Sequence, residues 1–213
     1  MSAEAAAGAS RVLLIHGLWM GPWSMAPLAR RLRAAGFAPE RFGYGSVREA
    51  HEACVRRLLE AIRGGPPAHL VGHSLGGLLA VRAAAAAPGA VRRIVCLGSP
   101  LSPSPTAASV ARLPGGRVLL GCAREALAAG ACDWGDCCVG MIAGDAPHGL
   151  GAVVRRFDGP HDGSVALAET RSPRLAGHCV VHASHSGLLF STEAAAACAA
   201  FLRHGRFPDR PRE

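Results

Sequence analysis

The sequence predicts an α/β fold in which a mostly parallel sheet is flanked by helices. Its 213 residues suit one domain, and only 18% of them are charged while half are hydrophobic, which excludes a largely disordered chain. Short apolar runs alternate with helical patterns along the chain, as is typical of βαβ units. We expect a flexible N-terminus over residues 1–10, one domain over residues 11–204, and a C-terminal tail over residues 205–213.

Six short apolar runs bounded by turn residues are expected to be the strands. The first, RVLLIH, is apolar up to a polar end, as expected of a strand that is covered on both faces. Ligands of parallel sheets bind at the carboxyl ends of the strands, so the residues just after each run are the candidates for function. The six runs are residues 11–16, 39–44, 69–72, 91–97, 137–143 and 178–183.

Apolar residues at helical spacing predict the helices that connect these strands. Glycine and proline end several of them, such as Gly36 after the first helix and the run GGPP after the second. Between the fourth and fifth strands, proline and glycine leave room for only two short helices, so any cap over the sheet is expected to be small. The expected helices cover residues 27–35, 48–63, 75–87, 107–113, 119–129 and 192–203.

The chain carries a formal net charge of +8, and all 23 of its basic residues are arginines. A dedicated nucleic-acid-binding protein clusters its basic side chains on one face and interleaves aromatic residues for stacking. These arginines are scattered instead, which argues against a specific nucleic-acid partner and leaves a weak attraction to anionic surfaces. The largest local groups are residues 30, 31 and 33 and the pairs 56–57, 92–93 and 155–156.

Eight cysteines raise the question of disulfides or a metal site. The first ten residues contain Glu4 and no basic side chain, so no signal peptide is expected, and no apolar stretch approaches the ~18–20 residues of a membrane-spanning helix. The chain is therefore expected to be cytoplasmic, where thiols stay reduced. The closest cysteine group, C-x4-C-C, lacks the C-x2-C pairs of structural zinc sites, and no metal is expected.

The most informative motif is GHSLGG, which contains G-x-S-x-G with Ser74 at its centre. It lies between a short predicted strand and a predicted helix, the context in which a sharp turn exposes a serine oxygen above a sheet. Gly72 and Gly76 lack Cβ atoms, so the strand and the helix can approach closely around the serine. The helix that begins at Leu75 aims its positive end at the same place. Ser74 is therefore the predicted nucleophile.

A turn with the sequence HGLW follows the first predicted strand. A backbone N–H after such a turn can pair with the N–H after the nucleophile to bind the oxyanion of a tetrahedral intermediate. The predicted donors are the main-chain amides of Leu18 and Leu75. The alternative is an ordinary strand-to-loop glycine turn without a chemical role.

The late segment VHASHSGLLF supplies the expected general base. His185 lies in the loop between the last strand and the last helix, where a base belongs if the chain order is serine, acid, histidine. His182 lies within the predicted strand and is expected to pack or hydrogen-bond there. His73 is expected to be structural, and His148 and His161 are expected to be loop residues.

With the HG-x-x turn, GHSLGG and SHSGLLF, the sequence resembles an α/β-hydrolase, specifically the small lipases and esterases of bacteria. The resemblance extends from about residue 11 to residue 201 and is strongest at GHSLGG and around His185, where small bacterial lipases have a similar H-x-G-L-L run. It implies a compact α/β-hydrolase fold with little or no lid. It also implies a Ser-His-Asp triad that hydrolyses esters or amides through an acyl-enzyme.

Three aspartates compete for the acid position of this triad. Asp162 lies in DGPHDGSV, which resembles the D-G-x-V pattern that small lipases show at their acid, and it precedes His185 by 23 positions. Asp145 follows the fifth predicted strand almost directly, which is the commonest place for the acid in this fold. The connection from that strand to Asp162 is longer than usual. Asp162 is the preferred acid, and Asp145 and Asp158 are the alternatives.

In the resulting scheme Ser74 attacks an ester carbonyl, His185 takes the serine proton, and Asp162 orients the histidine. This chemistry needs no cofactor. Trp19 and Met20 are expected to line an apolar pocket for small or medium acyl groups.

Two further apolar residues near the same turn, Trp23 and Met25, could also line this pocket, although an anchor for the first helix is the preferred interpretation of Trp23. A thioesterase or acyltransferase would use the same acyl-enzyme chemistry. A catalytically silent hydrolase-fold binding protein and an arginine-driven anion- or nucleic-acid-binding protein are the remaining alternatives. The joint presence of a serine, a histidine and an acid favours an enzyme.

Overall fold

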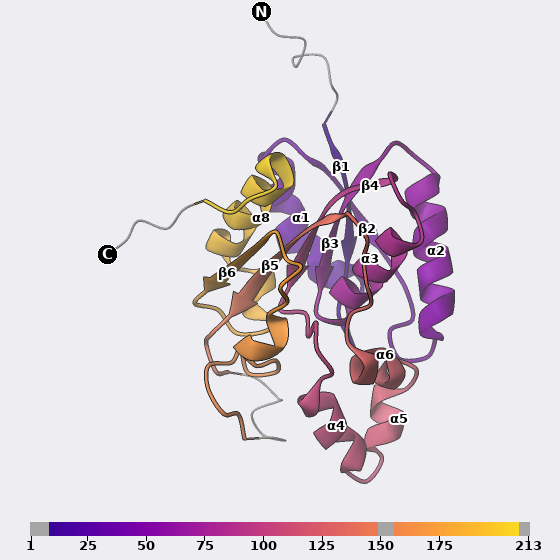
Figure 1. Cartoon of the computed structure of the whole chain (residues 1–213), viewed down its shortest axis with the longest axis vertical. Coiled ribbons are helices and arrows are strands. Elements are labelled where there is room, and N and C mark those ends of the chain that lie inside the picture. The colour runs from indigo at the N-terminus through magenta and orange to yellow at the C-terminus, as the bar shows by residue number, and fades with distance from the viewer. Residues whose placement is uncertain (1–8, 149–155, 209–213) are drawn as a thin grey trace, which may run out of the picture.

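The computed structural model describes residues 9–148 and 156–208 of the chain (Figure 1). These residues form a six-stranded sheet in which neighbouring strands are parallel, in the spatial order β2-β1-β3-β4-β5-β6. The predicted α/β class with a parallel sheet is confirmed. The strands are β1 Arg11–Ile15, β2 Ala38–Phe42, β3 Ala68–His73, β4 Val91–Leu97, β5 Cys138–Gly144 and β6 Gly177–Val181.

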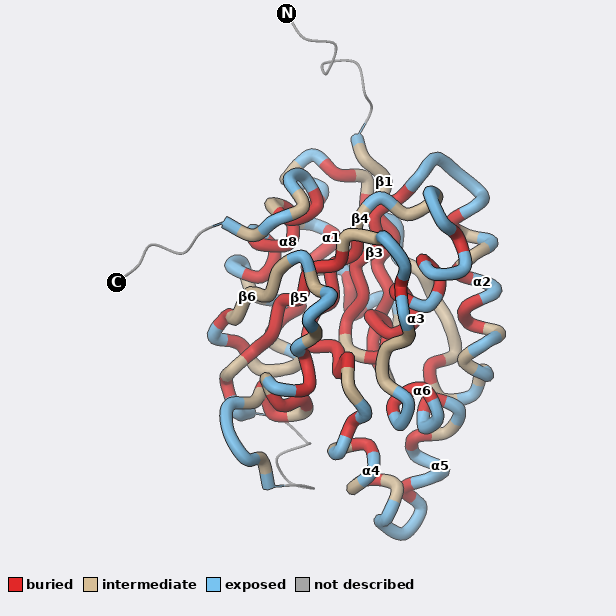
Figure 2. The backbone as a smooth tube through the Cα atoms, viewed as in Figure 1, coloured by how far each residue is buried: buried red, intermediate tan, exposed pale blue. Residues whose placement is uncertain are grey.

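The two faces of the sheet are covered by α1 Ala26–Ala34, α2 His51–Arg63, α3 Leu75–Ala85 and α8 Thr192–His204. Strand β1 shows why its sequence is apolar throughout. Val12 and Leu14 pack into the core on the side of α1 and α8, whereas Leu13 and Ile15 pack into the core on the side of α2 and α3. Figure 2 shows the central strands buried and the outward parts of the helices exposed.

Three short helices, α4 Pro105–Arg112, α5 Gly116–Leu120 and α6 Ala123–Ala129, form a cap between β4 and β5 at the carboxyl edge of the sheet (Figure 1). The prediction of one helix over residues 119–129 is wrong, because Gly121 interrupts it with a φ of 53°. A Cβ atom at this glycine would collide with the backbone carbonyl of Val47. The break therefore reflects contact with a distant loop, and the cap stays small.

Turns and 3-10 helices complete the described connections. Helix α2 begins at His51 rather than at residue 48, since the preceding residues form a turn in which the Gly45 amide donates to the Glu49 carboxylate at 2.9 Å. The 3-10 helices are η2 Pro22–Met25, η3 Leu167–Thr170 and η4 Gly187–Leu189.

The expected flexible N-terminus and C-terminal tail lie largely outside the described residues, which exclude 1–8 and 209–213. At the start of the tail, Phe207 packs on Phe201 of α8 with ring centroids 4.8 Å apart. Cys54, Cys96 and Cys198 are buried thiols. Among the described residues, no helix is long and apolar enough to cross a membrane.

The buried histidine of β3 predicts a pH-dependent stability. His69 is 3% exposed, and burial together with the charges of Arg93 and Arg92 lowers its pKa from 6.5 to about 4. Below pH 6.5 the unfolded chain takes up a proton that the folded chain refuses, so stability present above pH 6.5 is lost as the pH falls toward 4. The slope is at most about 1.4 kcal/mol per pH unit.

Urea unfolding at several pH values between 7.5 and 4 would measure this slope in the native chain and in His69→Leu. The substitution should reduce the slope of the unfolding free energy against pH by the contribution of one proton. The same substitution at the exposed His204 of α8 is the matched control and should leave that slope unchanged. An equal slope in His69→Leu and the native chain would contradict the assignment.

Candidate active site

Ser74 occupies the sharp turn between β3 and α3 that GHSLGG predicts. Its backbone has φ 53° and ψ −121°, a strained conformation for a residue with a side chain. Gly72 and Gly76 permit this turn, since a Cβ atom on either would collide with backbone atoms of the neighbouring segment. The Ser74 amide donates to the carbonyl of Leu97 in β4 at 2.8 Å, which ties the turn to the next strand.

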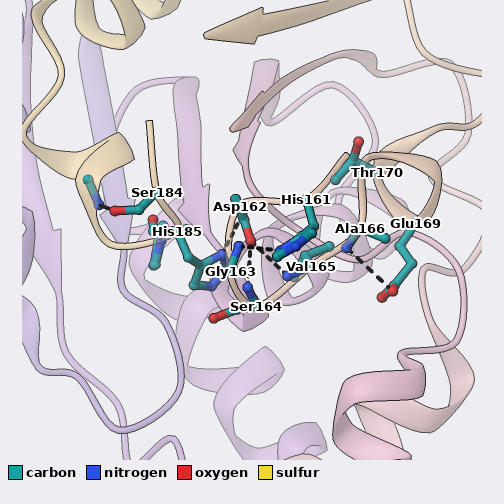
Figure 3. Close-up of polar contacts among 12 residues, drawn as sticks. His161, Asp162, Gly163, Ser164, Val165, Ala166, Glu169, Thr170, Ser184 and His185 are labelled. Carbon is teal, nitrogen blue, oxygen red and sulfur yellow. Dashed lines mark hydrogen bonds and ion pairs between the residues drawn. The ribbon is translucent and has the colours of Figure 1, made fainter. Parts of the chain in front are cut away.

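Asp162 and His185 form the central contact of the site (Figure 3). His185 Nδ1 lies 2.7 Å from Asp162 Oδ2, and the backbone N–H of His185 donates to the Asp162 carbonyl at 2.7 Å. The second carboxylate oxygen accepts from the backbone N–H groups of Ser164 and Val165 at 2.9 and 2.7 Å. The Asp162 side chain is 1% exposed and the His185 side chain 13% exposed, so the pair is largely shielded from water.

The hydrogen bonds of this pair define its protonation. Burial opposes ionisation of Asp162, but the charge and hydrogen bond of His185 and the amides of Val165 and Ser164 outweigh burial and keep the pKa of this carboxyl below its ordinary value. An ionised carboxylate can only accept hydrogen bonds, so the proton of neutral His185 resides on Nδ1. In that tautomer the lone pair of the ring is on Nε2.

The other two candidate aspartates lie elsewhere. Asp145 pairs with His182 through Oδ1 and Nδ1 at 2.9 Å, and these side chains are 37% and 81% exposed. His182, expected within the last strand, thus lies just beyond it and faces solvent. Asp158 is exposed at the surface. Of the three candidate aspartates, all of which lie within the described residues, Asp162 is the one that hydrogen-bonds His185.

The HGLW turn lies directly against the serine turn. His16 is fully buried, donates from Nδ1 to the carbonyl of Gly17 at 2.9 Å, and stacks on Tyr44 with ring centroids 4.4 Å apart. The Tyr44 hydroxyl donates to the carbonyl of His16 at 2.9 Å. Leu75 is the first residue of α3, where backbone N–H groups have no intrahelical acceptor. Tyr44 therefore supports the HGLW turn through both a ring stack and a hydrogen bond.

A cavity of about 470 Å³ adjoins Ser74 and His185. Its cap side is largely apolar, with Ser104 and Thr106 as polar members, whereas several serine and histidine side chains line the part that contains Ser74. His148, expected to be a loop residue, does lie in a loop and lines this cavity. The apolar residues that the cap contributes are Ala107, Val110, Leu120 and Leu127.

Trp19 and Met20 line the same cavity, in the position that the sequence suggests for them. Trp23 lines it as well and is 70% exposed, so it does not anchor the first helix by burial. Met25 is fully buried within the core on the α1 side of the sheet, which excludes it from the cavity wall. The expectation that Met25 could line the pocket is wrong, because η2 turns its side chain into the core.

His73 has a supporting contact that sequence reasoning missed. Its Nε2 donates to the carbonyl of His185 at 2.9 Å, and its ring centroid lies 4.7 Å from that of His185. Burial, reinforced by the neighbouring His185, lowers the pKa of His73 to about 3, so it stays neutral. The sequence shows a histidine next to the serine but not its partner, because that partner is a backbone carbonyl more than a hundred positions away.

The fold and this geometry define a class: an α/β protein with a serine turn and an aspartate–histidine pair at the carboxyl edge of a parallel sheet. The sequence model of the α/β-hydrolase fold family matches residues 10–119, more than half of the chain. The chain belongs to the α/β-hydrolase fold family. No match is found among curated protein sequences.

Several solved structures share the fold at low sequence identity. A lipase from Bacillus licheniformis in its mature form superimposes with a TM-score of 0.76 at 16% identity, covering 93% of this chain and 92% of the lipase. The monoacylglycerol lipase of Paleococcus ferrophilus gives 0.60 at 16% identity, covering 93% and 96%. Tomato methylketone synthase I gives 0.65 at 14% identity, covering 92% and 98%.

Proposed function

We propose that the protein is a serine hydrolase that cleaves carboxylic esters through an acyl-enzyme on Ser74. The observation that carries this proposal is the buried Asp162–His185 pair, joined at 2.7 Å, whose histidine lines the same cavity as the strained serine. A structural ion pair would have no need of an adjoining apolar cavity or of a nucleophile held in a costly conformation.

In the first half of the reaction, Ser74 Oγ attacks the ester carbonyl carbon while its proton passes to Nε2 of His185. Asp162 keeps the Nδ1 proton in place and stabilises the imidazolium that forms. The electron pair of the carbonyl moves onto its oxygen, and the amides of Leu18 and Leu75 hold that oxyanion. Collapse of the tetrahedral intermediate expels the alkoxide, which takes the proton from His185.

In the second half, water attacks the acyl-enzyme. His185 removes a proton from the water and then returns it to Ser74 Oγ as the carboxylic acid leaves. The same groups serve both halves, so no additional acid or base is required.

The volume of about 470 Å³ and the apolar wall of the cavity favour a small or medium acyl chain. The apolar wall that the cap provides, together with Trp19 and Met20, would cover an acyl chain extending from Ser74. Each methylene buried there contributes about 0.8 kcal/mol of binding energy, which is roughly a fourfold effect per carbon until the cavity is filled.

A fluorophosphonate probe tests this function directly, because it reacts with activated serines and forms a stable adduct. Purified native chain should be labelled at one site, identified by peptide mass spectrometry as Ser74, and should hydrolyse p-nitrophenyl esters. Ser74→Ala should be neither labelled nor active while retaining its circular dichroism spectrum. A folded native chain that no serine-directed probe labels would overturn the proposal.

A further inference from the structure

Trp19 adopts a backbone conformation that glycine usually occupies in a turn of this kind. The Met20 amide donates to the Gly17 carbonyl at 3.4 Å, which closes a turn with Trp19 at its third position. Trp19 has φ 58°, and a positive φ at that position favours glycine because a Cβ atom is strained there. A large side chain held at such a site calls for a compensating contact elsewhere.

That contact joins the turn to the cap. The indole Nε1 of Trp19 donates to the carbonyl of Leu119 in α5 at 2.9 Å, across 100 positions of sequence. Carbonyls near the end of a helix lack intrahelical partners, so the indole satisfies a group that α5 leaves open. The Trp19 ring also lines the cavity alongside Leu120, the next residue of α5.

Helix α5 depends on such contacts because it is only five residues long, well below the length at which a helix is stable by itself. Val118 and Leu119 are 81% and 51% exposed, so Leu120, which is 2% exposed, is the one large apolar side chain by which α5 is buried. The backbone N–H of Cys122, just beyond the helix, donates to the Val47 carbonyl at 2.9 Å. Trp19 adds a side-chain hydrogen bond on the cavity side.

We propose that Trp19 is a positioning residue that holds α5 over the acyl cavity. Its strained backbone conformation directs the indole toward the cap, where Nε1 donates to the Leu119 carbonyl. The inference rests on the proposed ester hydrolysis for its kinetic consequence. Substrates whose acyl chain reaches the cap would depend on this contact more than an acetyl group, which ends near Ser74. Trp19 therefore sets the preference for longer acyl chains.

Trp19→Phe is the sharpest variant, because it keeps a ring in the wall and removes the N–H donor. For the octanoate ester of p-nitrophenol, KM should rise about three- to tenfold, the effect of losing one net hydrogen bond, while kcat is unchanged. For the acetate ester any rise in KM should be smaller, so the octanoate-to-acetate ratio of kcat/KM should fall about three- to tenfold. Trp134→Phe, a matched change at a tryptophan that does not line the cavity, should leave the octanoate-to-acetate ratio unaltered.

Limited trypsin digestion tests the contact between Trp19 and α5 without any reference to ester hydrolysis. The cap carries exposed arginines at positions 112, 117 and 124. Because proteolysis follows the population of the open cap, Trp19→Phe should be cut there about three- to tenfold faster than the native chain. Trp19→Gly relieves the strain in the turn but also loses the hydrogen bond, so it should be cut at least as fast as Trp19→Phe. Cleavage of Trp19→Gly more slowly than the native chain would mean that the strain alone matters.

The two assays separate the possible failures. An inactive native chain together with faster cleavage of Trp19→Phe would contradict the ester-hydrolase proposal but support the role of Trp19 in holding α5. Cleavage of Trp19→Phe at the native rate would overturn this role, whatever the kinetics. An equal loss of activity on acetate and octanoate would overturn the role in acyl preference.

Discussion

Replacing Asp162 by asparagine is expected to lower kcat for p-nitrophenyl esters about 10⁴-fold, the size of effect that the same change produces in a serine protease triad. The carboxylate of Asp162 accepts the Nδ1 proton of His185 at 2.7 Å. An asparagine can present its NH₂ group to Nδ1 instead, which moves the ring proton to Nε2. Nε2 of His185 would then carry the proton and have no lone pair with which to accept the proton of Ser74.

Asp145→Asn is the matched control for this experiment, because it removes a carboxylate that also pairs with a histidine. The Asp145–His182 pair is exposed to solvent, and the loss of such a pair should leave kcat within about twofold of native. Circular dichroism and urea unfolding of both variants would show that the chain remains folded. Comparable losses in the two variants, or a collapse only in Asp145→Asn, would contradict the assignment of the acid.

Local hydropathy was sufficient to predict most of the fold. Strand β1 is buried on both faces after Arg11, so VLLI is an unbroken apolar run, and the predicted strand Val91–Leu97 matches β4 residue for residue. The cap was harder to predict because its helix ends depend on tertiary contacts. The sequence does not show whether Gly121 lies within a helix or ends one. The break is explained by the close approach of Gly121 to the Val47 carbonyl, which lies in a distant loop.

The candidate site divides in the same way. Ser74 and His185 follow from short motifs, since each lies at the end of a strand in a local pattern that their chemistry requires. Asp162 needed a resemblance in addition to spacing, because Asp145 stands closer to its strand. The bond from Trp19 to the Leu119 carbonyl leaves no trace in the sequence, because any residue at 119 would present the same carbonyl.

Gly98 lies just beyond β4 and next to the aspartate–histidine pair, and the sequence analysis did not single it out. A Cβ atom there would lie 2.9 Å from Leu188 Cδ1, 3.0 Å from Asp162 Oδ2 and 3.2 Å from His185 Nδ1. Gly98 also has φ 56°, which adds backbone strain for any other residue. An alanine would therefore press on the hydrogen bond that orients the base.

Gly98→Ala is expected to reduce kcat about 100-fold, because a displacement of about 1 Å in a catalytic group has an effect of that order. Gly89→Ala separates this displacement from backbone strain. Gly89 has φ 78°, yet no atom lies within 4 Å of its added Cβ. Both variants should lose about 1–2 kcal/mol of stability through their positive φ, measured by urea unfolding. Only Gly98→Ala should also lose activity. A native kcat in that variant would contradict the prediction. It would mean that the Asp162–His185 contact, 2.7 Å long, tolerates a methyl group against it.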